Sequence, residues 1–201
     1  MQKEEVTEHL GKVVKILLIV GIVAALFLFG PAIKNGLLNL VYKSMQADIR
    51  ISPTTIEEWA RPDAVEVFSA ELIECGFEPI GDFTINQSSR VKIRAFMHRS
   101  RNIYAMVSDK YHTPALLDFY SFYEDGRSVR YTTAKNPHKS KPDNKTIWYI
   151  EDPLSIQEIV DKMVARRPEG ILLPVSAESF PPSLERDMEE ISLWESGEFM
   201  Q

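Results

Sequence analysis

An uncharged apolar run near the N-terminus constrains this chain more than any other feature. Residues 16–33 read ILLIVGIVAALFLFGPAI, eighteen residues without a charged side chain. As an α-helix this run would be about 27 Å long at ~1.5 Å per residue, close to the hydrocarbon thickness of a bilayer. A helix in a soluble core keeps a polar face, and this run has none. The run therefore predicts a single transmembrane helix, with the lipid bilayer as its partner.

A cleaved signal peptide is the alternative interpretation of this segment, and it would make the rest of the chain a secreted domain. The run is longer than the apolar core of a signal peptide, about 7–15 residues, and no clean pair of small residues marks a cleavage site. Gly30 and Pro31 are better suited to kink or end a helix. We therefore expect a tail over residues 1–15, an uncleaved signal-anchor over 16–33 and a juxtamembrane connector over 34–53.

The charges that flank the run predict its orientation. Lys3, Lys12 and Lys15 precede it together with the α-amino group, while Lys34 and Lys43 follow it. Lysine and arginine are retained on the cytoplasmic side of membranes. The small excess before the run places the N-terminus in the cytoplasm and the C-terminal domain outside it.

After the connector, the apolar pattern changes from a helical period to a strand period and back. Thr55 with Glu58 fits a capping box, and Pro62 suits the first turn of a second helical run that ends at Gly76. Alternating segments then predict strands, and Asp125-Gly126 predicts a hairpin between two of them. These strands cover residues 77–86, 91–98, 103–108, 116–124, 128–133 and 146–150.

The last third returns to a helical period. Ser155 can cap a helix that ends near Arg167, residues 168–182 form a proline-containing loop, and Ser183 begins an acidic helix through Glu195. The predicted fold class is α+β: a single N-terminal transmembrane helix, then an antiparallel β-meander of five or six strands flanked by helices. The α+β domain covers residues 54–167, and the segment 168–201 packs on it, with the C-terminal helices on one face of the sheet.

Charge is distributed unevenly along the chain. The net charge is −6 overall, +7 over residues 86–145 and −8 over residues 146–201. A basic sheet face and loop would suit an acidic partner or lipid headgroups. The alternative is that the chain's own acidic helices neutralise these cations. The candidate surface comprises Arg90, Lys92, Arg94, His98, Arg99, Arg101, Arg127, Arg130, Lys135, Lys139, Lys141 and Lys145.

The acidic C-terminal helix carries one apolar stripe, spaced at four, three and three residues. Its members are Leu184, Met188, Ile191 and Trp194. Such a stripe packs either on the sheet of its own domain or into a neighbouring subunit.

Motifs for catalysis or cofactor binding are absent from the sequence. It has no phosphate-binding glycine loop, no nucleophile elbow and no histidine pair at metal-binding spacing, and Cys75 is its only cysteine. We therefore expect no cofactor, no metal and no nucleic acid. The predicted function is that of a non-catalytic accessory or binding subunit, with a protein partner in the membrane. The alternative is a membrane-anchored enzyme or ligand sensor, whose pocket between the sheet and the C-terminal helices would use Tyr104, His112, Asp118 or Arg94.

Overall fold

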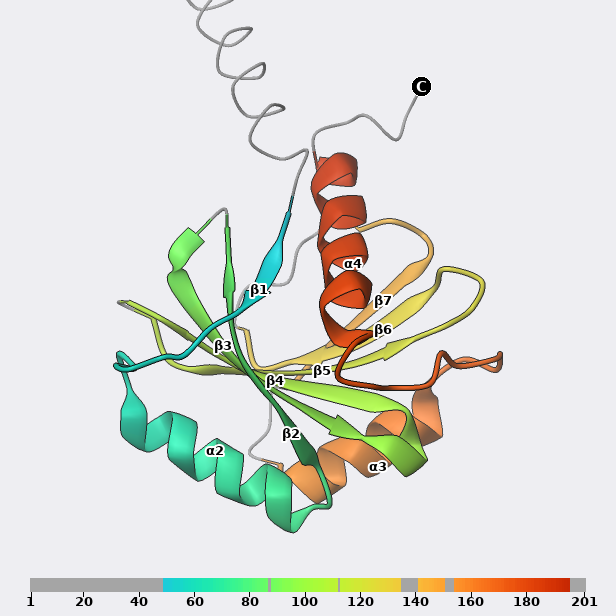
Figure 1. The fold of residues 1–201 in the computed structure, drawn as a ribbon. Coiled ribbons are helices and arrows are strands. Elements are labelled where there is room, and N and C mark those ends of the chain that lie inside the picture. The colour runs from blue at the N-terminus through green and yellow to red at the C-terminus, as the bar shows by residue number, and fades with distance from the viewer. Residues whose placement is uncertain (1–48, 87, 112, 135–140, 151–153, 196–201) are drawn as a thin grey trace, which may run out of the picture. The chain divides into compact units, whose positions relative to one another are not determined.

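The strands form one sheet in which every strand lies beside its neighbour in the sequence (Figure 1). All neighbouring pairs are antiparallel except β6 and β7, which are parallel. The six predicted strands are confirmed. The predicted number and the purely antiparallel pairing are wrong, because a seventh strand precedes the others and the last pair is parallel. The strands are β1 (Ile51–Pro53), β2 (Glu78–Ile85), β3 (Ser88–His98), β4 (Ile103–Lys110), β5 (Leu116–Phe122), β6 (Ser128–Thr132) and β7 (Lys145–Tyr149).

This computed structural model describes residues 49–86, 88–111, 113–134, 141–150 and 154–195. The chain divides into two compact units, Met1–Met45 and Gln46–Gln201, and every described element belongs to the second. The predicted tail, the predicted transmembrane helix over 16–33 and most of the connector lie outside the described residues. Within those residues, no helix combines the length and the apolar character that a bilayer-spanning segment needs.

Helices cover both faces of the sheet (Figure 1). The helices α2 (Pro62–Glu74) and α3 (Ile156–Arg166) lie on one face, and α4 (Phe180–Glu195) lies on the other. A short 3₁₀ turn, η1 (Arg99–Arg101), joins β3 to β4. The expectation that the C-terminal helices share one face is therefore wrong. Central strands have apolar side chains on both faces, and each face needs its own cover.

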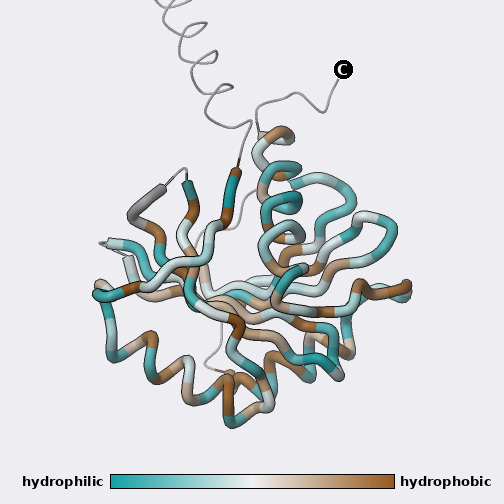
Figure 2. The backbone as a smooth tube through the Cα atoms, viewed as in Figure 1, coloured by the Kyte–Doolittle hydropathy of each residue, from teal (hydrophilic) through white to brown (hydrophobic). Residues whose placement is uncertain are grey.

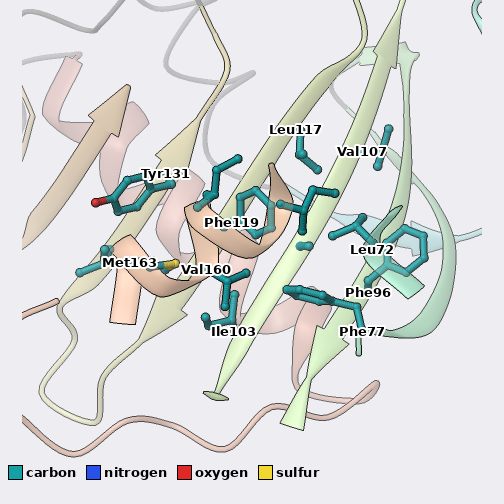
Figure 3. Packing of buried hydrophobic residues seen from close by; sticks show 14 of the residues in the cluster. Leu72, Phe77, Phe96, Ile103, Val107, Leu117, Phe119, Tyr131, Val160 and Met163 are labelled. Atoms are coloured by element: carbon teal, nitrogen blue, oxygen red, sulfur yellow. The ribbon is translucent and has the colours of Figure 1, made fainter. Parts of the chain in front are cut away.

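Two apolar clusters fill the space on either side of the sheet. The first lies under α2 and α3 and includes Leu72, Phe119 and Met163, all fully buried (Figure 3). The second lies under α4 and includes Ile93 and Leu184. Apolar and polar residues alternate along α2 in the helical period that this packing requires (Figure 2). Each fully buried large side chain contributes roughly 1.5–3 kcal/mol of transfer free energy to the fold.

Two predicted helix ends are confirmed. Ser155 caps α3 and forms the full capping box with Glu158, whose carboxylate accepts from the Ser155 amide at 2.8 Å. Gly76 follows α2 with φ +84°, a conformation that other residues rarely adopt. Its amide donates to the Ile73 carbonyl at 3.0 Å and thereby closes the last turn of the helix.

Two predicted helix starts are wrong, each for a physical reason. No helix begins at Thr55, because tertiary contacts hold residues 58–61 in a non-helical conformation: the Glu58 carbonyl accepts from Lys92, and the Asp109 carboxylate accepts from the Arg61 amide at 3.0 Å. Helix α4 begins at Phe180, before the expected Ser183. The two prolines that follow Phe180 occupy the first turn, where a missing N–H costs no helical hydrogen bond.

Strand β1 lies at one edge of the sheet and is held there by α4. The Thr54 amide donates to the Asp82 carbonyl of β2 at 2.9 Å. Backbone nitrogens alternate in direction along a strand, so those of Ile51 and Pro53 face away from β2. The Ile51 N–H donates to the Glu185 carboxylate of α4 at 2.6 Å, and Pro53 has no N–H. The outer edge of β1 therefore carries no unused backbone donor over these residues.

Candidate anion-binding surface

The predicted basic residues do not share one face of the sheet. Lys92, Arg94 and His98 of β3 lie on the face that α2 and α3 cover, whereas Arg130 of β6 and Lys145 of β7 lie on the face that α4 covers. Residues on alternate positions of a strand point to opposite faces, and the sheet separates these two groups. The side chains of Arg90, Lys135 and Lys139 lie outside the described residues.

Arg94 is bound within the domain. Its Nε donates to Asp82 at 2.9 Å, its Nη1 to Glu66 of α2 at 2.7 Å, and its guanidinium lies 5.0 Å from the centre of the Trp59 ring. The hydrogen bond to Asp82 raises the pKa of Arg94 above its ordinary value. The charge of Arg94 is therefore used to join α2 to the sheet.

A buried ionic network joins α4 to the sheet on the other face. Lys145 is 3% exposed at its side chain and pairs with Asp187 at 2.9 Å and Glu190 at 2.5 Å, while Ser128 donates to Asp187 at 2.5 Å. These contacts balance the charge of Lys145 inside the domain. Lys141 donates to the Lys145 carbonyl.

Arg130 is bound beside this network. It donates to the Asp118 carboxylate at 2.8 and 3.0 Å and lies over the ring of Tyr120. Burial opposes the charge of Arg130, but Tyr120 and Asp118 outweigh it and raise its pKa. Burial likewise raises the pKa of Tyr120 well above its ordinary value. Together with Arg94 and Lys145, Arg130 fits the alternative in which the chain's own acidic residues neutralise its cations.

Three predicted arginines lie at the surface in pairs that solvent reaches. Arg99 contacts Glu78 at 3.0 Å, Arg101 approaches Asp161 at 3.9 Å, and Arg127 contacts Asp125 at 2.7 Å. Exposed ion pairs contribute about 0–1 kcal/mol, because water and salt screen them. The carboxylates of a partner could therefore replace these acidic neighbours at little cost.

Arg167, which the sequence analysis assigned only to a helix end, lies beside Arg101. Its Nη1 donates to the Arg101 carbonyl at 2.7 Å, and within the described residues no carboxylate lies at ion-pair distance from it. Partial burial lowers the pKa of Arg167, Tyr123 opposes this, and neighbouring Arg101 lowers it further. We call Arg99, Arg101 and Arg167 the arginine corner.

His98 adjoins the arginine corner. Its ring meets Phe77 edge to face, with ring centres 5.1 Å apart. Burial lowers the pKa of His98, and the positive charge of Arg101 lowers it further. Arg99 and Arg101 belong to the surface predicted from the sequence, whereas Arg167 was missed: its only sequence signal is the Arg166-Arg167 pair before Pro168, which lies in the acidic part of the chain.

The predicted partner helix is largely committed to its own domain. Leu184 is fully buried, and Met188 packs against the cluster under α4. Ile191 and Trp194 are half-buried. This packing fits the first alternative for the stripe, a contact with the domain's own sheet.

The residues proposed for an enzyme or sensor pocket do not converge. The Tyr104 hydroxyl donates to the Ser176 carbonyl at 2.9 Å, Asp118 pairs with Arg130, and Arg94 lies on the opposite face. His112 lies outside the described residues. In the part of the chain that the structure describes, no three metal-ligating side chains come together. Comparison with protein-family models, curated proteins and solved structures yields no match.

Proposed function

We propose that the chain is a single-pass membrane protein, anchored by residues 16–33, whose folded domain is a non-catalytic binding or accessory subunit of a membrane-associated complex. The eighteen uncharged residues of this run support the anchor. The anchor would confine the domain to the layer in which a membrane complex lies and so raise its effective concentration there.

The binding role is supported by the contrast between cations that are paired inside the domain and cations that lie at its surface. Arg94, Arg130 and Lys145 form ion pairs within the domain. In the arginine corner, Arg99 and Arg101 form only weak, exposed ion pairs, and Arg167 donates to a backbone carbonyl. The buried acids Asp118 and Asp187 serve those internal pairs. Recognition of an anionic partner is therefore the chemistry that the described residues support best.

Membrane extraction of the full chain tests the anchor. We expect the chain to stay in the membrane pellet after alkaline carbonate treatment, and V23R/L26R to be released, because each arginine at the centre of a bilayer costs about 2.5–3.5 kcal/mol. The matched control L38R/L40R places the same charges beyond the run and should stay in the pellet. A mature N-terminus beyond residue 31 in an intact-mass measurement would instead identify a cleaved signal peptide.

Photo-crosslinking in native membranes tests the binding role. A photoreactive phenylalanine analogue at position 99, in the arginine corner, should give a defined crosslinked partner. The same analogue at position 110, at the exposed end of β4, serves as the control and should give none. Equal crosslinking from both positions, or none from either, would contradict a specific partner surface.

The lysine distribution supports a domain outside the cytoplasm. Protease added to intact cells should then digest the domain, and a cytoplasmic domain would remain intact until the cells are lysed.

A further inference from the structure

We infer that the arginine corner is the docking surface for an acidic segment of a partner protein. This inference rests on the proposed function, because it takes the folded domain to be a binding subunit. Three observations carry it: an uncompensated arginine, two exchangeable ion pairs, and an exposed apolar side chain on a fixed backbone.

Arg167 supplies the uncompensated charge. Arg167 is half-buried, and its guanidinium donates to the neutral carbonyl of Arg101. The guanidinium of Arg101 adds a second positive charge nearby. Partly desolvated cations are ordinarily paired, because burial of a lone charge is costly. The C-terminal end of α3 offsets roughly half a charge through the helix dipole. The remainder is available to a carboxylate from outside the chain.

Arg99 and Arg101 supply exchangeable pairs. The Arg99–Glu78 pair is 58% and 53% exposed, and the Arg101–Asp161 pair is 41% and 56% exposed at a separation of 3.9 Å. An incoming carboxylate can form a bidentate pair with either guanidinium, which is stronger than these screened contacts. Two or more carboxylates on one segment could therefore engage the corner together.

Ile171 indicates that the partner is a protein segment. Its side chain is 69% exposed, yet its backbone is fixed, since the Glu124 amide donates to its carbonyl at 3.0 Å and the Leu173 amide donates to Phe122 at 2.8 Å. The preceding residue, Gly170, fits against Tyr123 and Arg127. Ile171 thus presents an exposed apolar side chain in the loop that follows Arg167. Such a side chain suits a segment with an apolar residue among acidic ones, and offers nothing to an inorganic anion.

Fluorescence anisotropy of the full chain in nanodiscs tests the inference. The probe is a fluorescein-labelled deca-glutamate peptide at about 50 mM salt, where screening is modest. We expect R101Q/R167Q to weaken binding about tenfold, the effect of losing roughly 1.4 kcal/mol. The control K110Q/R186Q removes two exposed cations elsewhere and should change the dissociation constant less than twofold. If R101Q/R167Q has a lower melting temperature than the unmodified chain, R99Q/R101Q is used in its place, because the ion pairs of Arg99 and Arg101 are exposed.

A second peptide tests the role of Ile171. A leucine placed at the centre of the glutamate peptide should tighten binding to the unmodified chain, and I171S should remove this gain without changing binding of deca-glutamate. Equal weakening by both double variants, or displacement of the peptide by millimolar inorganic phosphate, would overturn the inference. So would capture of phosphatidylserine vesicles that R101Q/R167Q abolishes. None of these outcomes alters carbonate extraction or partner crosslinking, so the proposed function is judged separately.

Discussion

At the residue scale, Gly170 determines whether the loop after α3 can lie against the sheet. Its φ of +151° belongs to the region that favours glycine. An added Cβ would displace the end of the flexible Arg127 side chain and would lie 3.0 Å from Cδ1 of the buried Tyr123 ring. We expect G170A to lower the free energy of unfolding by about 2–4 kcal/mol, since overpacking adds to backbone strain. Thermal unfolding followed by circular dichroism measures this loss.

Gly126 provides the matched control for that prediction. Its φ of +84° is also positive, but a Cβ there meets nothing within 4 Å. G126A should therefore cost only about 1 kcal/mol from the backbone conformation. Equal losses in the two variants would show that the contacts of Gly170 are unimportant.

His98 predicts a pH dependence of stability. Its pKa is lowered in the fold by burial and by Arg101, so below about pH 6.5 the unfolded chain binds the proton more readily than the folded chain. Neutral His98 therefore contributes fully to the free energy of unfolding above about pH 6.5. This contribution is lost as the pH falls below about 6.5 toward the lower pKa of His98 in the folded chain. The melting temperature should fall less between pH 7 and pH 5 in H98Q than in the unmodified chain, and parallel curves would refute this role.

At the element scale, α4 is fastened to both edges of the sheet. Glu185 binds the Ile51 amide of β1, and Asp187 binds Lys145 of β7. The right-handed twist of a seven-stranded sheet allows its two edge strands to reach one helix. The attachment is partly ionic, and each half of it can be tested.

Replacement of Lys145 should strongly lower the free energy of unfolding. K145M leaves Asp187 buried without its cation, and we expect a loss of about 3–5 kcal/mol in the free energy of unfolding. The double variant K145M/D187N should lose less than the sum of the two single variants, because the residues are in contact. R99M, which breaks an exposed pair, should cost no more than about 1 kcal/mol. Urea unfolding measures all four values.

The two halves of α4 should differ in their importance for stability. Leu184 is fully buried, and L184A should cost about 2–5 kcal/mol. Trp194 is half-buried near the end of the helix, and W194A should cost markedly less. A larger loss for W194A in the same unfolding assay would mean that the stripe stabilises the domain mainly through its C-terminal half.

The element boundaries show which parts of the fold local sequence determines. Gly76, Ser155 and the Asp125-Gly126 turn carry their signals within a few residues, and each occurs where it was predicted. The three-residue strand β1 is too short to show alternation. The segment after Thr55 has helix-start chemistry, but contacts from Lys92 and Asp109 hold it in a non-helical conformation.

The candidate surface was harder to predict, because pairing depends on the fold. Arg130 and Lys145 have the composition of an anion-binding site, yet Asp118 and Asp187 neutralise them across distances that sequence spacing does not encode. Arg167 was missed for the opposite reason: it lies in an acidic segment, and only the packing of α3 beside η1 places it near Arg101.

At the scale of the whole molecule, local stability should decrease from the centre of the sheet outward. Strand β4 is buried along nearly its whole length, whereas β1 spans three residues at an edge. Hydrogen exchange followed by mass spectrometry should find the slowest amides in β3, β4 and β5, and faster exchange in β1 and the last turn of α4. Slow exchange throughout β1 would instead mean that its contact with Glu185 makes it part of the central cooperative unit.

The blocked edge of β1 has a consequence for a crowded membrane. If residues 16–33 anchor the chain, its copies diffuse in two dimensions, and an open strand edge would repeatedly meet identical edges. Edge-to-edge strand addition is the usual route from such encounters to aggregates. With the Ile51 amide bound by Glu185 and no N–H at Pro53, β1 gives an encountering copy no backbone donor to extend the sheet. Over residues 51–53, this edge of the sheet is thereby closed to an incoming strand that would need its backbone donors.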